Sequence, residues 1–276
     1  MDLHQRENIE IELFMQALKA RHGYDFAGYA QASFGRRVRA LMQSAGAATI
    51  SSLTERLIHD EAFLPEVIGK LSVPVSEMFR NPLVFDLLRR EVLPVLASYP
   101  QINIWQAGCA HGEEAYSIAI LLKEAGLYAR ARIYATDISD VALQVAREGI
   151  YPLREAKLFS SNYLQAGGTG SLADWYTAAY NHIKLDVSLA ERITFANHNL
   201  AADGVFGEMH LILCRNVLIY FGEELQQRAL GLFRDSLVRG GFLCLGDRER
   251  PSELRFAEDF RAIDAGASVF RRFASR

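Results

Sequence analysis

The sequence predicts an α/β protein with a Rossmann-like, mostly parallel sheet and an antiparallel edge, preceded by a small all-α domain. Residues before about 70 show helical periodicity and no strand pattern. Short apolar runs then alternate with amphipathic stretches, which is typical of parallel strands joined by crossover helices. Two apolar runs near the end of the chain, at 256–260 and 268–273, have no helix between them and indicate an antiparallel edge pair.

Length and composition are those of a globular protein. The first residues, MDLHQRENIE, lack a secretory h-region, so we expect a cytoplasmic location. The 276 residues exceed one typical domain of about 100–150 residues. A net charge of −3 gives no overall attraction to nucleic acid or to anionic membranes. No apolar segment approaches the roughly 20 residues that span a bilayer, and the three cysteines and seven histidines show no metal-ligand spacing. We therefore expect no nucleic-acid partner, no membrane insertion and no metal site, and nothing in the sequence demands more than a monomer.

The N-terminal segment is expected to contain four helices. The first carries Ile9, Leu13 and Leu18 on its apolar face and ends at Gly23. The others are expected over 26–46, from Ser51 or Ser52 onward, and over 61–70.

The second of these helices carries Arg36, Arg37 and Arg39, a cluster with two interpretations. The cluster is either a solvated helix face or a surface that docks onto an acidic protein. Guanidinium groups suit docking because they bind carboxylates in a directional, bidentate way.

The connector after the helices reads LSVPVSEMFRNP and carries Ser76 and Arg80. Arg80 is a fixed cation on an otherwise apolar segment between two domains. It either faces a functional site or pairs with an acid that joins the domains. A helix over 83–97 then leads into the first strand.

Residues 102–126 predict a strand, a tight turn with Gly108 and Gly112, and a helix. In a parallel sheet this arrangement places a cofactor at the carboxyl end of the strand. Glu113 and Glu114 begin the helix, where they would repel a pyrophosphate and attract a cation. S-adenosylmethionine carries an ammonium, a sulfonium and no phosphate. The alternative is that both acids only complement the helix dipole.

Polar residues follow the later strands at the same edge of the sheet. Asp137 ends the run RIYATDI, and an acid at the tip of the second strand, after the glycine turn, is placed to hold two ribose hydroxyls. The alternative is that Asp137 caps the next helix, but Ser139 or Asp140 can already do that. Asn199 and Asn216 follow the third and fourth strands, where ligands bind, although either is also suited to a turn. Residues 150–180 show no sustained period and are expected to form loop and short helix over the cofactor side.

Four stretches, PVSEMFR, IWQAGCAHGEEAYSIAILL, IYATDIS…ALQVAREGIY and LILCRNVLIYF, together with the RRVR cluster, resemble the CheR family of chemotaxis receptor protein-glutamate O-methyltransferases. The resemblance covers nearly the whole chain. It implies a class I S-adenosylmethionine-dependent methyltransferase fold and methyl esterification of glutamates on the cytoplasmic helical bundle of chemoreceptors. S-adenosylhomocysteine would be the product.

The resemblance also implies roles for individual residues. Arg36, Arg37 and Arg39 would dock on the receptor. From the chemistry of a carboxylate acceptor, we expect Arg80 to hold the substrate carboxylate or the mouth of the site as a catalytic residue. Serine replaces the family's usual threonine at the first cofactor position and keeps the hydroxyl. The cofactor contacts that the resemblance implies are Ser76, Arg80, Glu113, Asp137, Asn199, Leu200, Asn216 and Val217. We add Gly108 because it forms the turn at the cofactor site.

The expected division is a receptor-docking helical domain at 1–71, a connector at 72–98 that contributes to the cofactor site, and a methyltransferase domain at 99–276. Family members that bind a receptor's C-terminal pentapeptide carry a small β-subdomain with a basic, glycine-containing loop between the second and third sheet strands. Here the AGGTGS stretch within 162–186 lacks basic residues. We therefore expect a pentapeptide-independent protein.

The sequence is compatible with two other functions. The chain is also compatible with a small-molecule methyltransferase, or with a non-catalytic module that senses S-adenosylmethionine or S-adenosylhomocysteine.

Overall fold

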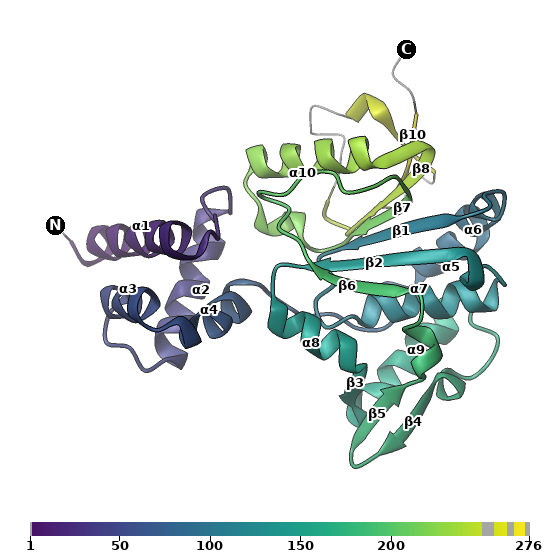
Figure 1. The fold of residues 1–276 in the computed structure, drawn as a ribbon, viewed down its shortest axis with the longest axis horizontal. Coiled ribbons are helices and arrows are strands. Elements are labelled where there is room, and N and C mark those ends of the chain that lie inside the picture. Colours follow the sequence, from purple (N-terminus) through teal and green to yellow (C-terminus); the bar gives the residue numbers. More distant parts are fainter. Residues whose placement is uncertain (1, 250–256, 264–267, 274–276) are drawn as a thin grey trace.

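The computed structural model describes residues 2–249, 257–263 and 268–273. A helical domain lies beside a larger α/β domain, and an extended segment after α4 joins them (Figure 1). None of the described helices combines the length and the apolar character that crossing a membrane requires.

The helical domain contains the expected helices around one apolar core. Gly23 ends the first helix with a φ of 79°, as its position predicts. Thr49, rather than Ser51 or Ser52, caps the third helix. Ile9 and Leu13 were expected in the core but are 47% and 51% exposed, because α1 turns Phe14 and Leu18 inward instead. The helices are α1 (Leu3–His22), α2 (Gln31–Ser44), α3 (Ile50–His59) and α4 (Leu64–Leu71), with a 3-10 turn at Glu61–Phe63.

The helix expected over 83–97 is broken into three parts, α5 (Pro82–Leu87), a π-helical turn (Leu88–Val92) and α6 (Leu93–Leu96). Pro94 explains the irregularity. Proline offers no N–H to the preceding turn and its ring clashes with the carbonyl four residues back, so the helix widens just before it.

The main sheet confirms the predicted fold class. Its order is β6-β2-β1-β7-β8-β10-β9, with β10 antiparallel to both of its neighbours and the other pairs parallel. The order reverses between β1 and β7, which creates a switch point at the carboxyl ends of these strands. Residue 256 of the expected edge run lies outside the described residues. The strands are β1 (Ile102–Ala107), β2 (Ala131–Asp137), β6 (Ile193–Asn197), β7 (Met209–Cys214), β8 (Leu237–Leu245), β9 (Phe260–Ala262) and β10 (Val269–Arg272).

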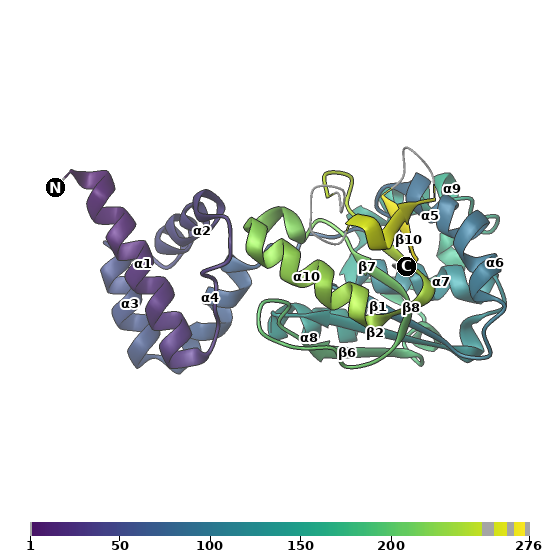
Figure 2. The same ribbon diagram turned by 90° about the horizontal axis from the view of Figure 1, so that it is seen from above.

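Helices cover both faces of this sheet. α10 (Glu223–Ser236) lies on one face, and α7 (Glu113–Glu124) and α8 (Asp140–Glu148) lie on the other (Figures 1 and 2). Alternate residues of β1 serve the two faces: Ile104 packs in the core under α7, and Trp105 packs in the core under α10.

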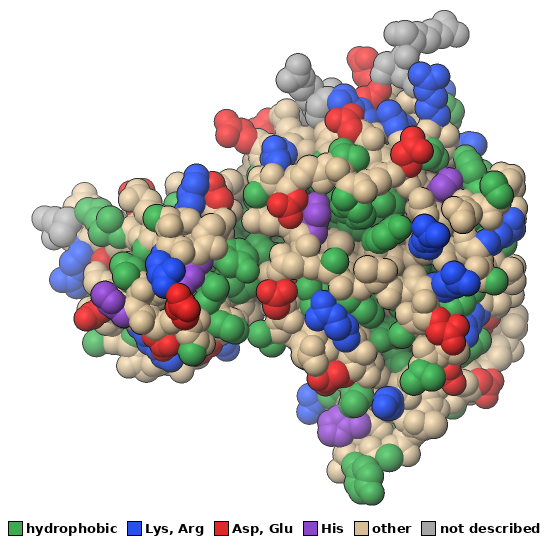
Figure 3. Space-filling model, in the orientation of Figure 1, with side chains coloured by type: hydrophobic (Ala, Val, Ile, Leu, Met, Phe, Trp, Pro, Cys, Tyr) green, Lys and Arg blue, Asp and Glu red, His purple; other side chains and the backbone are tan. Residues whose placement is uncertain are grey.

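A second, three-stranded sheet with the order β3-β5-β4 follows α8, so the expectation of only loop and short helix over 150–180 was wrong. It consists of β3 (Ile150–Pro152), β4 (Tyr176–Ala179) and β5 (His182–Leu185), with α9 (Ala156–Gln165) between β3 and β4. The hairpin turn is Tyr180–Asn181, both with positive φ. Tyr180 is 97% exposed, and Figure 3 shows hydrophobic side chains at this tip.

Candidate active site

A cavity of about 320 Å³ opens at the carboxyl ends of β1, β2 and β7, at the switch point of the sheet. The structure brings every predicted cofactor residue except Glu113 to its wall. Those wall residues are Ser76, Arg80, Gly108, Asp137, Asn199, Leu200, Asn216 and Val217.

Gly108 forms the turn that brings backbone to the cavity. The amides of Gly108 and Cys109 both donate to the Thr136 carbonyl, at 2.8 and 2.9 Å, which ties the turn to β2. Gly108 has a φ of 78°, and a Cβ at this position would lie 2.4 Å from Cγ2 of Val217. Glycine is therefore required here by backbone conformation and by space.

Asp137 is 9% exposed and accepts backbone hydrogen bonds at both carboxylate oxygens. Ala110 N–H donates at 2.8 Å and Ser139 N–H at 3.0 Å. Burial raises the pKa of Asp137, and these hydrogen bonds oppose the rise. Ser139 caps α8, as expected, through the bond from Ala142 N–H at 3.3 Å. Because each carboxylate oxygen has two lone pairs, Asp137 retains acceptor capacity toward the cavity.

Glu113 begins α7 and is 3% exposed. Its Oε2 atom is buried with no hydrogen-bond partner among the described residues. Burial raises the pKa of Glu113 to about 7, although the nearby Ser76 hydroxyl lowers it. A buried carboxyl with an unused oxygen is suited to a cationic ligand.

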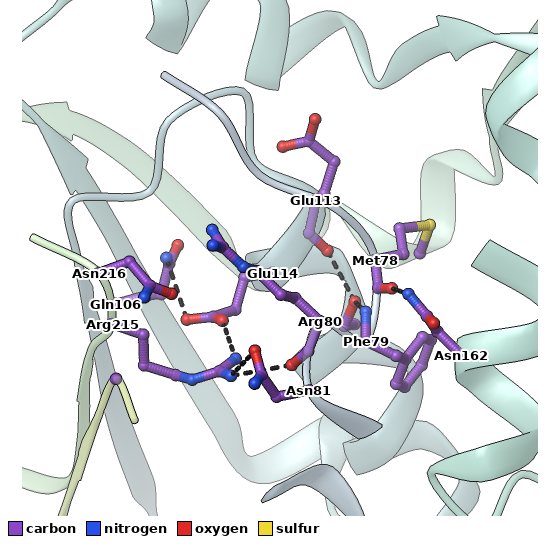
Figure 4. Close-up of polar contacts among 12 residues, drawn as sticks. Met78, Phe79, Arg80, Asn81, Gln106, Glu113, Glu114, Asn162, Arg215 and Asn216 are labelled. Atoms are coloured by element: carbon purple, nitrogen blue, oxygen red, sulfur yellow. Dashed lines mark hydrogen bonds and ion pairs between the residues drawn. The ribbon is translucent and has the colours of Figure 1, made fainter. Parts of the chain in front are cut away.

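Glu114 has a different environment, and the two carboxylates point in different directions (Figure 4). Glu114 Oε2 pairs with Nη1 of Arg215 at 2.5 Å, and the two side chains are 7% and 2% exposed. The expectation that both acids face a cation therefore needs correction, because Glu114 is already neutralised. The signal for Arg215 in the sequence is its position directly after an apolar strand, because a buried arginine there requires a buried acid.

Arg80 lines the cavity, and none of its contacts with the described residues is with an acid. Its Nη1 donates to the Val75 carbonyl at 3.4 Å, and no ion pair of Arg80 is found among the described residues. The alternative in which Arg80 joins the two domains through an acid is therefore not what the structure shows. Its neighbours Phe79 and Asn81 have φ values of 51° and 56°, so a strained backbone presents this guanidinium.

Backbone contacts also shape the loops that carry the two asparagines. Asn199 Oδ1 accepts from Ala201 N–H at 2.9 Å, so this residue forms the turn that the sequence left open. Asn216 has a φ of 59°, and its N–H donates at 3.0 Å to Oε2 of Glu249. Glu249 is 5% exposed and was not anticipated, because it lies on a different strand connection from the loop it stabilises.

The helical domain supplies part of the cavity wall, a contribution that no pattern in the sequence indicates. Tyr29 and Arg37 line the cavity, and the Arg37 guanidinium stacks 4.2 Å over the ring of Tyr220. Arg37 also donates to the Leu71 carbonyl and to Ser33 Oγ, and it is only 7% exposed. A docking role for Arg37 on the receptor is therefore corrected. Arg36 is exposed, and Arg39 pairs with Glu7 at 2.6 Å.

Comparison with known proteins identifies the family. The model "CheR methyltransferase, SAM binding domain" matches residues 74–266, and "CheR methyltransferase, all-alpha domain" matches residues 9–72. The chain belongs to the CheR methyltransferase family.

Two relatives illustrate this membership. Cher3 of Pseudomonas putida strain KT2440, which is named provisionally as a methyltransferase, is 43% identical over 272 residues, with 99% of this chain and 100% of Cher3 covered. The chemotaxis protein methyltransferase of Listeria innocua is 31% identical over 244 residues, with 86% of this chain and 88% of the relative covered. Among solved structures, the S-adenosylmethionine-dependent methyltransferase SibL is 14% identical with a TM-score of 0.35, covering 88% of this chain and 56% of SibL.

The cofactor of the CheR domain is S-adenosylmethionine, and the cavity fits it. Gln106 Oε1, Glu113 Oε2 and His198 Nδ1 are buried without a partner among the described residues, and Gln106 and His198 line the cavity. Unused acceptors of this kind suit the amino groups of the cofactor. Leu200 and Ile138 add apolar wall beside the Asp137 carboxylate.

Proposed function

We propose that the protein transfers the methyl group of S-adenosylmethionine to glutamate side chains on the cytoplasmic helical bundle of chemoreceptors, as a cytoplasmic enzyme. Relatives named chemotaxis protein methyltransferase support this acceptor class. The observation that carries the proposal is Arg80, an arginine in the cavity wall with no acidic partner among the described residues. A buried or half-buried guanidinium of this kind is suited to a carboxylate.

The chemistry of a glutamate acceptor agrees with the residues in the wall. S-adenosylmethionine supplies an electrophilic methyl group on a sulfonium when it is bound. A glutamate, with a pKa near 4.3, is already ionised at neutral pH, so its oxygen needs no general base. The chain's own residues then have to align the carboxylate and exclude water, with reacting atoms at roughly 3–3.5 Å. Arg80 is proposed to hold that carboxylate or to close the mouth of the site.

The cofactor contacts remain proposals for individual residues. Glu113, beside the Ser76 hydroxyl, is proposed to hold the ammonium, and Asp137 is proposed to hold the ribose. The remaining proposed contacts are Arg80, Gly108, Asn199, Leu200, Asn216 and Val217. The division into a docking domain at 1–71, a connector at 72–98 and a catalytic domain at 99–276 belongs to the same proposal.

Receptor docking is assigned to the exposed part of the arginine cluster, Arg36 and Arg39. Arg36 is exposed on α2, and Arg39 keeps 39% of its side chain exposed beside Glu7. We also propose that the protein does not bind a receptor pentapeptide, because of the composition of the hairpin in the small sheet. The AGGTGS stretch lies after α9 rather than in a hairpin, while the hairpin of the small sheet has a two-residue turn, Tyr180–Asn181, without glycine or a basic residue.

The test is transfer of radiolabelled methyl to membranes that contain chemoreceptors of the same organism, followed by mild alkali to release methyl esters as methanol. Alkali-labile label on a receptor is expected. It should be lost in Arg80→Ala, and the acceptor KM should rise when Arg36 and Arg39 are replaced by glutamine. No label, with cofactor binding intact, would refute the proposed reaction and favour the sensor function.

A matched control removes an arginine outside the cavity. Arg90 is exposed and pairs with Asp86 at 2.9 Å on α5 and its extension. Arg90→Ala is expected to keep full activity. Deletion of the helical domain is a poor discriminator between protein and small-molecule acceptors, because Tyr29 and Arg37 would leave the cavity wall with it.

A further inference from the structure

The ion pair between Arg215 and Glu114 reaches the segment that presents Arg80. Arg215 Nη1 binds Glu114, while its Nη2 donates to the Arg80 carbonyl at 2.9 Å and to Asn81 Oδ1 at 3.2 Å (Figure 4). One planar guanidinium therefore joins the first turn of α7, the loop after β7 and the connector.

The connector needs such a restraint. Phe79 and Asn81 both have left-handed backbone conformations on either side of Arg80. Residues other than glycine keep a left-handed backbone conformation only when surrounding contacts hold them in it. Two contacts restrain the segment before Arg80: Phe79 N–H donates to Ser117 Oγ at 2.9 Å, and Asn162 donates to the Met78 carbonyl at 3.0 Å. Arg215 contacts Arg80 itself and Asn81, on the following side.

We propose that Arg215, oriented by Glu114, is a positioning residue that sets the Arg80 guanidinium at the cavity. Glu114 supplies the charge that permits a buried arginine, and the second nitrogen of Arg215 fixes the Arg80 backbone. Gln106 supports the arrangement through a bond from its Nε2 to Glu114 Oε1 at 3.4 Å. The role of Arg80 in turnover rests on the proposed function, whereas its placement is measurable without an acceptor.

Arg215→Lys is the informative variant. Lysine keeps the positive charge beside Glu114 but lacks the planar fork that reaches the acid and the connector together. Turnover is expected to fall about 10- to 100-fold, while the Kd for S-adenosylhomocysteine changes less than about threefold. In an Arg80→Ala background the same change should lower turnover no further, because Arg215 acts through Arg80.

Arg89 offers a matched control of similar construction outside the cavity. Its Nη2 pairs with Glu124 at 2.7 Å, and its Nε donates to the Ala166 carbonyl at 3.4 Å. Arg89→Lys removes the same kind of fork and is expected to leave turnover and cofactor affinity unchanged.

Placement is read separately by amide hydrogen exchange of residues 79–81 with S-adenosylhomocysteine bound. Exchange should be faster in Arg215→Lys than in wild type or Arg89→Lys. Three results would each overturn the positioning role: unchanged exchange in Arg215→Lys, unchanged turnover in Arg215→Lys, or a loss of turnover from Arg215→Lys that is as large in the Arg80→Ala background as in the wild type. If the wild type transfers no methyl at all, the proposed function fails, and the exchange result alone decides the positioning role.

Asn81→Gly provides a second variant if Arg215→Lys does not fold. Glycine accepts the positive φ of Asn81 but removes both the Oδ1 acceptor of Arg215 and the Nδ2 donor to Asp247. A smaller loss of turnover, about 3- to 10-fold, with unchanged cofactor affinity is expected. Wild-type turnover in Asn81→Gly would count against the arrangement.

Discussion

Gly108→Ala should separate the steric requirement of the cofactor turn from its backbone conformation. A Cβ at Gly108 would lie 2.4 Å from Cγ2 of Val217, and the φ of 78° is unfavourable for alanine. Gly126, which follows α7, is a matched control with a φ of 69° and no atom of the described residues within 4 Å of an added Cβ. Both variants therefore share the conformational cost, and only Gly108→Ala adds a clash.

The magnitudes follow from these two contributions. A left-handed alanine costs about 1–2 kcal/mol, so Gly126→Ala should lower the free energy of unfolding by that amount. Overpacking adds typically 1–3 kcal/mol, which gives about 2–5 kcal/mol for Gly108→Ala. If the turn relieves the clash by moving into the cavity, cofactor binding must reverse that movement. Binding would then bear the overpacking cost of about 1–3 kcal/mol, which corresponds to roughly 5- to 150-fold weaker affinity.

The assay combines urea unfolding with calorimetric titration of S-adenosylhomocysteine. Val217→Ala removes the clashing methyl, so the double variant Gly108→Ala/Val217→Ala should recover most of the extra loss in both measurements. The Val217→Ala single variant completes the cycle and corrects for any contact of Val217 with the cofactor. Equal losses in Gly108→Ala and Gly126→Ala, or no recovery in the double variant, would refute the steric argument.

Three further predictions concern the same cavity and its surroundings. Glu113→Gln should flatten the pH dependence of cofactor binding. Burial raises the pKa of Glu113 to about 7, and a cationic ligand favours the charged carboxylate. The affinity of the wild type, measured by calorimetry, should therefore fall as the pH drops below about 7. A wild-type affinity that does not change between pH 8 and 5.5 would contradict this role for Glu113. Arg80→Ala should lower turnover far more than cofactor affinity, and equal turnover would remove Arg80 from catalysis. A receptor C-terminal pentapeptide should show no measurable affinity in calorimetry, and clear saturable binding would end the claim of pentapeptide independence.

The parts of the fold and site that the sequence predicted depend on local signals. Gly108 and Gly112 mark the turn because positive φ values, 78° and 91°, select glycine. Ser139 was one of two expected caps because a cap interacts within its own first turn. The polar residues after β2, β6 and β7 were expected together because parallel strands end at one edge, and the structure places Asp137, Asn199 and Asn216 around one cavity.

The missed features depend on distant partners or on weak patterns. Arg215 and Glu114 are 101 residues apart, and no local rule connects them. Strand β4 is exposed at nearly every position, so it lacks the apolar alternation that identifies a strand. In the sequence Arg37 resembles Arg36 and Arg39. In the structure α2 turns Arg37 inward against Tyr220, and this orientation depends on contacts with the α/β domain.

The helix that carries the arginine cluster is also tied to the wall of the cavity. Ala30 N–H donates to the Tyr220 carbonyl at 3.0 Å and Gly222 N–H to the Gly28 carbonyl at 2.7 Å, so the start of α2 is fastened to the loop after β7. The same loop carries Asn216 and Val217 in the cavity wall. The start of α2, the helix that carries the proposed docking residue Arg36, is therefore joined to the cavity wall by backbone hydrogen bonds. The helical domain is thus part of the cofactor enclosure as well as the proposed docking face.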